Sequence, residues 1–316
     1  MKKYILEITV FISWFIVLTY EVVWARVLGP FYGTSIFVWT AMIGIILASL
    51  SVGYSLWGKL ADQKNARKEV LADMLFFASI CVAITYIIRI PLLEYLTTSI
   101  HSIRMGSVIA ATILFLPASV FLGMVSPYAV KLRITWESHT GSIIWNMSAL
   151  GTIGSILGTF ITGFYLIPSF GISSLLATLP IILGVLSLFI APHHKKYLKL
   201  VYIFLLVFGV GFWKNTSANP LLVDERDTLY SHVQILEGIN YAMNERVRML
   251  RINVENHSSM SLDSDRLVNH YGEYYHLVRH FMPRFKDALM IGWAGYSYPK
   301  EYLKKYPWKT MDVVEI

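Results

Sequence analysis

The sequence predicts an α-helical membrane domain of six to seven transmembrane helices, followed by a small antiparallel β-domain and one strand–helix–strand unit. Of the 316 residues, 55% are hydrophobic and 15% are charged, which is more apolar than an ordinary soluble protein. The whole formal charge of +7 lies in residues 1–213, because the basic and acidic residues of 214–316 balance. The chain therefore divides into an apolar, basic part and a polar part.

The distribution of basic charge and the single cysteine argue against a nucleic-acid partner, a disulfide and a cysteine-based metal site. The excess of Lys and Arg lies in short loops between apolar segments, as in the cytoplasmic loops of membrane proteins, so we do not expect nucleic acid as a partner. Cys81 is the only cysteine in the sequence, which excludes an intrachain disulfide and a cysteine-based metal site.

Six segments have the length of about 20 largely apolar residues that a membrane-spanning helix requires. The first is expected to remain as an anchor, because Glu21 and Arg26 follow its apolar run without a small-residue cleavage site. A seventh segment, 198–213, is only just long enough, so it either crosses the membrane or lies at its interface. The six predicted spans are 4–28, 36–58, 71–93, 106–126, 143–167 and 172–191.

The basic residues also predict the orientation of the chain. They gather in alternate loops, at residues 2–3, 59–68, 131–133 and 195–199, which places the N-terminus in the cytoplasm. We therefore expect a multi-pass protein of the cell (inner) membrane, with the bilayer as its first partner. The side of the polar tail stays open, because it depends on whether segment 198–213 crosses.

Small and charged residues inside the spans indicate helix contacts. Gly154 and Gly158 form a GxxxG pattern within a glycine-rich stretch, 151–163, of the kind that lets two helices approach closely in lipid. A contact within the chain is favoured over a homodimer. Glu21 and Arg26 have two equally favoured interpretations. They mark a polar cavity, or Glu21 bonds a neighbouring helix while the Arg26 side chain reaches the membrane interface.

The polar part contains short strands and helices. Segments 229–236 and 247–254 are predicted strands, joined through a polar stretch, and residues 271–282 have the apolar spacing of a helix that Pro283 stops. The chain then continues as a strand, 288–291, a helix, 299–305, and a strand, 311–316. The predicted domains are 1–213, 221–270 and 271–316.

The strand–helix–strand segment carries a candidate nucleoside site. Gly292 and Gly295 lie in the turn after its first strand, where small residues let the backbone approach a ligand at the start of the helix. Glu315 lies at the tip of the second strand, where a carboxylate can accept both hydroxyls of a ribose. The order and spacing of these three features favour nucleoside binding over a plain loop.

A metal site is not expected. Glu273, His276 and His280 lie on one face of the predicted helix, but no fourth ligand is evident in the sequence.

Several motifs of this sequence, including the strand–helix–strand segment, resemble the spermidine synthase family. The resemblance to the membrane-integrated members of that family covers nearly the whole chain. The resemblance implies an aminopropyltransferase-like protein that binds decarboxylated S-adenosylmethionine or S-adenosylmethionine as a substrate, with no tightly bound cofactor. It also implies that the strand–helix–strand segment is an incomplete class I methyltransferase-like α/β Rossmann unit. The motifs that carry the resemblance are 21–26, 151–163, 230–235, 250–253, 274–280, 288–303 and 312–316.

Residue by residue, the resemblance is uneven. Glu315 matches the family's ribose-binding glutamate and Gly292 its glycine turn, whereas Gly295 takes the place of an aspartate that holds the aminopropyl amine. Tyr275 takes the place of a histidine that contacts the polyamine, Ser231 of a glutamine near the adenosine, and His257 of another glutamine. The resemblance thus implies nucleoside contacts by Gly292, Gly295, Tyr296 and Glu315, and amine-side contacts by His257, Tyr274 and Tyr275.

The family's catalytic aspartate lies beyond a further strand pair, so we interpret the sequence as truncated within the Rossmann unit and assign no catalytic residue. Two alternatives remain. Residues 58–62, followed by Arg67 and Lys68, resemble a cytoplasmic loop of major-facilitator transporters, which suggests a transporter-like protein with a nucleoside-binding tail. The second alternative is an S-adenosylmethionine-dependent methyltransferase.

Overall fold

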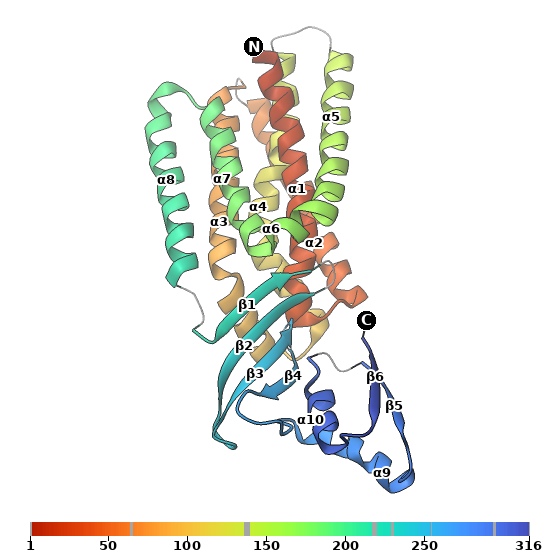
Figure 1. Cartoon of the computed structure of the whole chain (residues 1–316). Coiled ribbons are helices and arrows are strands. Elements are labelled where there is room, and N and C mark those ends of the chain that lie inside the picture. The colour runs from red at the N-terminus through yellow and green to blue at the C-terminus, as the bar shows by residue number, and fades with distance from the viewer. Residues whose placement is uncertain are drawn as a thin grey trace. The chain divides into compact units, whose positions relative to one another are not determined.

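The structure is a computed structural model that describes residues 2–63, 66–135, 140–216, 220–228, 231–253, 255–292 and 295–315. It divides into two compact units, Met1–Thr216 and Ser217–Ile316, which are described separately (Figure 1). The first unit is helical, and the second holds two small sheets.

The helical unit is a bundle of long helices. Gly33 and Gly171 both have positive φ, of 76° and 74°, and they end the helices before them in the left-handed backbone that glycine adopts at least cost. The helices are α1 (Lys2–Tyr32), α2 (Ile36–Gln63), α3 (Lys68–Ser99), α4 (Ile103–Ile134), α5 (Thr140–Ile161), α6 (Ile167–Phe170), α7 (Ile172–Ile190) and α8 (His193–Thr216), with a π-helical turn, η1 (Thr162–Leu166), between α5 and α6.

Six helices in the described part of the chain are long and apolar enough to cross a membrane. They correspond one to one to the six predicted spans, which are confirmed by length and composition: Tyr4–Tyr32, Ile36–Trp57, Lys68–Ser99, Ile103–Ile134, Thr140–Phe170 and Ile172–Ile190. The chain is therefore a multi-pass membrane protein whose apolar helices contact the lipid bilayer.

The glycine face of α5 packs against α1. Gly151, Gly154 and Gly158 are buried there, and a Cβ added at Gly154 would lie only 2.4 Å from the carbonyl oxygen of Phe11. The face is therefore used within the chain, as the favoured interpretation predicts, and the homodimer stays a prediction. Glu21 and Arg26 are both partly exposed on α1.

Helix α8 contains segment 198–213, for which the sequence does not decide between crossing the membrane and lying at its interface. It packs against α3 and α7 through polar side chains: Lys199 Nζ lies 3.2 Å from an Asp73 carboxylate oxygen and donates to the Ser187 hydroxyl at 2.8 Å. The hydroxyls of Tyr202 and Ser79 are 3.0 Å apart. Figure 1 shows α8 running beside α7, from the end of the bundle that holds the N-terminus toward the other end.

The second unit begins with an antiparallel sheet in the order β1-β2-β3-β4. Strands β2 (His232–Asn240) and β3 (Glu245–Ile252) correspond to the two predicted strands, whose residues Leu229, Tyr230 and Val254 lie outside the described part. Their turn closes at Asn244, which has φ 51°.

The sheet has two strands that the sequence does not predict, β1 (Leu222–Asp227) and β4 (Glu255–Ser261). Both are mainly polar, so they lack the alternation of apolar residues that marks a strand. Strand β1 forms by pairing with β2, and β4 forms by pairing with β3. Neither strand has an apolar face of its own.

The helix predicted over 271–282 is wrong in type. Residues His270–Leu277 form a 3₁₀ helix, η2, and only Val278–Phe281 form an α-helical turn, α9, which ends before Pro283 as predicted. The 3₁₀ turns coincide with contacts of His276 to Glu301 and Tyr306, so tertiary contacts override the helical spacing.

The last segment has the predicted order of strand, helix and strand. Strands β5 (Asp287–Ile291) and β6 (Thr310–Val314) pair in parallel, with α10 (Ser297–Lys305) between them in sequence. Tyr298 and Tyr302 of α10 are buried in a small core with Leu267 and Met290. Exposed apolar side chains also remain on the two strands, at Leu289, Ile291 and Val314.

Candidate functional site

The carboxyl ends of β5 and β6 bring the glycine turn and the terminal acid to one edge. The strands are parallel, and the Gly292 backbone N–H donates to the Val314 carbonyl at 2.8 Å. Glu315 follows Val314 directly and is exposed. Gly292 has φ +82°, and no described residue lies within 4 Å of the position that its Cβ would occupy. Within the part of the chain that the structure describes, the Gly292 backbone is therefore uncovered beside an exposed carboxylate.

The second half of the turn packs onto the antiparallel sheet. Gly295 has φ +90°, and a Cβ there would lie 2.9 Å from the Ser258 side chain on β4. Tyr296, with φ 55°, precedes α10, whereas Trp293 and Ala294 lie outside the described residues. Gly295 therefore has a packing reason for lacking a side chain, independent of any ligand.

Helix α10 begins at this turn. No side chain caps it at Tyr296, and the buried Ser297 hydroxyl lies 3.2 Å from the Ser258 hydroxyl. The first turn of a helix carries partial positive charge, so this end of α10 favours a polar or anionic ligand group near the open edge.

The three residues predicted to contact the amine, His257, Tyr274 and Tyr275, differ in their exposure and in their contact with α10. Tyr275 is half exposed, and its ring centroid lies 5.3 Å from that of Tyr298, in the first turn of α10. Tyr274 is more exposed, and His257 is exposed at a β-bulge of β4, next to Ser258. Of the three predicted residues, Tyr275 is therefore the one with a ring contact to the start of α10.

A buried histidine network lies beside this site. His276 Nε2 is 3.0 Å from a Glu301 carboxylate oxygen, and His276 Nδ1 is 3.3 Å from the Tyr306 hydroxyl. Both ring nitrogens therefore have partners, and Glu273 lies instead near His270, at 3.7 Å. Among the described residues, no group of three or more His, Cys, Asp or Glu side chains could hold a metal ion. The network is a structural element that sequence spacing did not reveal.

Charged residues fix α10 to the loop after β4. Lys300 donates to the carbonyls of Ser261 and Ser264 at 3.0 and 2.9 Å, and Lys304 pairs with Asp265 at 2.8 Å. Hydrogen bonds from these two lysines lower the pKa of the Asp265 carboxyl. Burial, followed by the neighbouring tyrosines, raises the pKa of Tyr298, so its hydroxyl stays protonated at neutral pH.

Comparison of the chain with protein-family models, with curated proteins and with solved structures finds no match. The resemblance to spermidine synthases therefore rests on the sequence motifs alone.

Proposed function

We propose that the C-terminal unit of this membrane protein binds a nucleoside-containing ligand, with decarboxylated S-adenosylmethionine or S-adenosylmethionine as the favoured substrate. The observation that carries this proposal is the hydrogen bond from Gly292 to Val314, which holds the glycine turn beside Glu315. A ribose at this edge would meet a carboxylate that accepts its two hydroxyls and the backbone of Gly292, which carries no side chain of its own. We assign no catalytic residue.

The wider proposal is an aminopropyltransferase-like protein of spermidine synthase type. In it, β5, α10 and β6 form the first unit of a Rossmann-like fold of class I methyltransferase type. The exposed ring of Tyr275, near the start of α10, offers an aromatic face to a cationic amine, an interaction that such rings provide.

The topology of the helical unit carries a consequence for this ligand. The N-terminus is proposed to be cytoplasmic, because the basic residues gather in alternate loops. Helix α8 has 24 residues, which corresponds to about 36 Å at 1.5 Å per residue and is long enough to cross. If α8 crosses, the C-terminal unit lies on the non-cytoplasmic side and meets its ligand there.

Binding of labelled S-adenosylmethionine and its decarboxylated form to the full chain in detergent tests the proposal. We expect Glu315→Gln to weaken binding by about 1.5–3 kcal/mol, the range for hydrogen bonds to a charged group. Asp312→Asn is the matched control, because Asp312 is an exposed carboxylate of β6, the strand that Glu315 follows. It should leave the affinity unchanged.

Equal affinity of Glu315→Gln and the unaltered chain, or no binding of either ligand, would contradict the proposal. Incubation with an amine acceptor then separates the two transfer reactions. Aminopropyl transfer releases methylthioadenosine, whereas methyl transfer releases S-adenosylhomocysteine.

A further inference from the structure

Arg89 of α3 is a buried cation inside the helical unit. Its exposed fraction is only 9%, and it lies ten residues before the end of α3 at Ser99. The guanidinium donates to the carbonyl of Tyr86, and to the Ser173 hydroxyl on α7 at 3.1 Å. It also lies over the Tyr86 ring, 4.3 Å from the centroid.

The positive charge of Arg89 has no carboxylate within 4.0 Å among the residues that the structure describes, which distinguishes it from the other buried cations of the helical unit. Arg133 lies 3.4 Å from Glu7, and Lys199 lies 3.2 Å from Asp73. Neutral hydrogen-bond partners satisfy part of the guanidinium but do not balance its charge. A charge buried among the packed helices is costly without a counter-charge, so the position favours an anion.

The start of α7 adds positive potential at the same point. Ser173 is its second residue, and Gly171 before it provides no side-chain cap. The positive end of the helix dipole is therefore adjacent to Arg89, where a negative group is stabilised. Helix α7 has 19 residues, about 28 Å, so its start lies near the boundary between the hydrocarbon and the headgroups.

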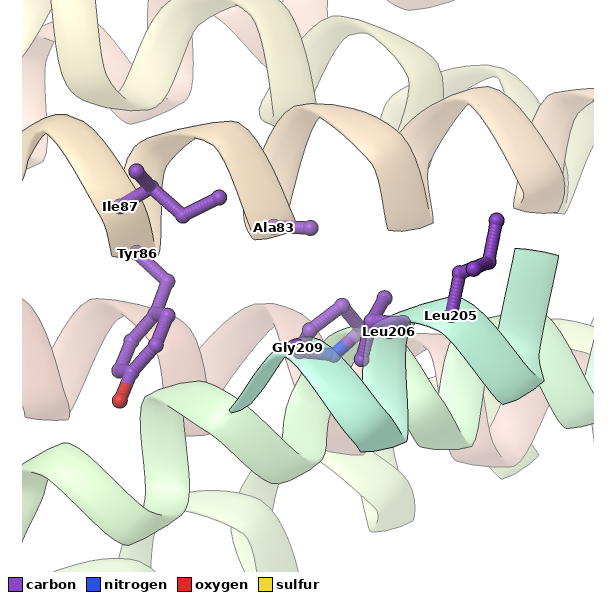
Figure 2. Close-up of a pocket in the computed structure, with 7 residues that line it drawn as sticks. Ala83, Tyr86, Ile87, Leu205, Leu206 and Gly209 are labelled. Carbon is purple, nitrogen blue, oxygen red and sulfur yellow. The ribbon is translucent and has the colours of Figure 1, made fainter. Parts of the chain in front are cut away.

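An apolar groove continues from Tyr86. Figure 2 shows Ala83, Tyr86 and Ile87 of α3 opposite Leu206 and Gly209 of α8, and Pro180 of α7 completes the lining. The groove has a volume of about 160 Å³, similar to the ~150 Å³ engineered cavity that binds benzene. Tyr86 belongs to both features, because its ring lines the groove and lies under the guanidinium.

We propose that Arg89 and this groove form a binding site for an anionic phospholipid. The phosphate pairs with Arg89 at the start of α7, and part of one acyl chain fills the groove between α3, α7 and α8. Charge complementarity selects this occupant, since the groove alone would accept any hydrocarbon chain while the buried cation requires a negative headgroup at the membrane boundary.

Native mass spectrometry of the full chain in a neutral detergent, with added lipid, tests the site. The probes are palmitoyl-oleoyl phosphatidylglycerol, the corresponding phosphatidylcholine, and dioleoylglycerol, which has chains but no phosphate. We expect phosphatidylglycerol to bind at least about tenfold more tightly than the other two. Arg89→Gln should remove this preference, whereas inorganic phosphate at millimolar concentration should not displace the lipid.

A second variant tests the groove without touching the cation. Gly209→Leu places a side chain at a position with no described residue within 4 Å of its Cβ, so it fills the groove without a clash between that atom and the described residues. It should abolish tight phosphatidylglycerol binding and leave the fold intact. Gly44→Leu is the matched control, because Gly44 is equally open but lines a different groove, between α2 and α4.

Three results would overturn the proposal: equal binding of the charged and neutral lipids, an unchanged preference in Arg89→Gln, or an unchanged preference in Gly209→Leu. Displacement of the lipid by inorganic phosphate would show a site for small anions instead. If Arg89→Gln fails to fold, Gly209→Leu and the comparison of lipids still decide.

Discussion

Replacement of Gly154 by alanine tests the packing of α5 on α1. The new Cβ would lie 2.4 Å from the carbonyl oxygen of Phe11, about 1 Å closer than an ordinary contact. Because that oxygen belongs to a helix backbone, it cannot rotate away, and the two helices must separate locally. Overpacking of this kind costs about 1–3 kcal/mol, and the better helix propensity of alanine returns up to about 1 kcal/mol.

We therefore expect Gly154→Ala to lower the free energy of unfolding by about 1–2 kcal/mol. Gly158→Ala should act similarly, since its Cβ would lie 2.5 Å from the Phe15 carbonyl oxygen. The double variant should cost less than the sum, because one separation of the helices relieves both clashes. The measurement is equilibrium unfolding of the purified chain, by titration of dodecyl sulfate into a mild detergent.

Gly141→Ala is the control in the same helix, because no described residue lies within 4 Å of its added Cβ. It should leave stability unchanged or raise it slightly. If Gly154→Ala is as stable as the unaltered chain, the close contact with Phe11 does not exist. If it instead converts a dimer to a monomer without loss of stability, the glycine face joins two copies of the chain.

Two further predictions concern the C-terminal unit. In a Cys81→Ala background, a cysteine at Lys64, outside the described residues, should not react with an impermeant maleimide in intact cells. If α8 crosses, Tyr241→Cys, which is 90% exposed, should react. Labelling at Lys64 would refute the cytoplasmic N-terminus, and an unlabelled Tyr241→Cys would show that α8 does not cross. Hydrogen bonds from the lysines near Asp265 lower its pKa, so the stability that they contribute is present above the unfolded value of about 3.9 and is lost as pH falls below it. The thermal midpoint should therefore decline below about pH 4, and Lys304→Met should reduce that decline; an equal decline in both proteins would contradict this role.

The membrane part was predictable because a span needs only length and apolar composition, and both are properties of one segment. Which helix packs against a given face, in contrast, depends on two segments and cannot be found from one of them. The sequence marks Gly154 as a close-contact position, but it does not contain the information that Phe11 is on the other side. In the same way, Arg89 is visible as an isolated charge within a span, whereas its contact with Ser173 depends on how α3 and α7 pack.

In the C-terminal unit, the parts of the site that follow from strand direction were predictable. Parallel strands end at one edge, so Gly292 and Glu315 were expected to meet there, and the Gly292–Val314 hydrogen bond brings their backbones together. Ser258 could not be recognised, because it lies on a polar strand that forms only by pairing. His276 and Glu301 are 25 residues apart, and no local pattern connects them.

The pairing of Lys199 with Asp73 and Ser187 has a consequence for how the protein is made. If α8 crosses, Lys199 stays near the cytoplasmic end of the helix, and the opposing charge of Asp73 is already present on α3 to hold it there. Helix α8 is thereby expected to enter the bilayer as the last member of an existing helix assembly rather than alone. A change that removes Asp73 would then act during biosynthesis, by leaving α8 outside the membrane and the C-terminal unit on the wrong side.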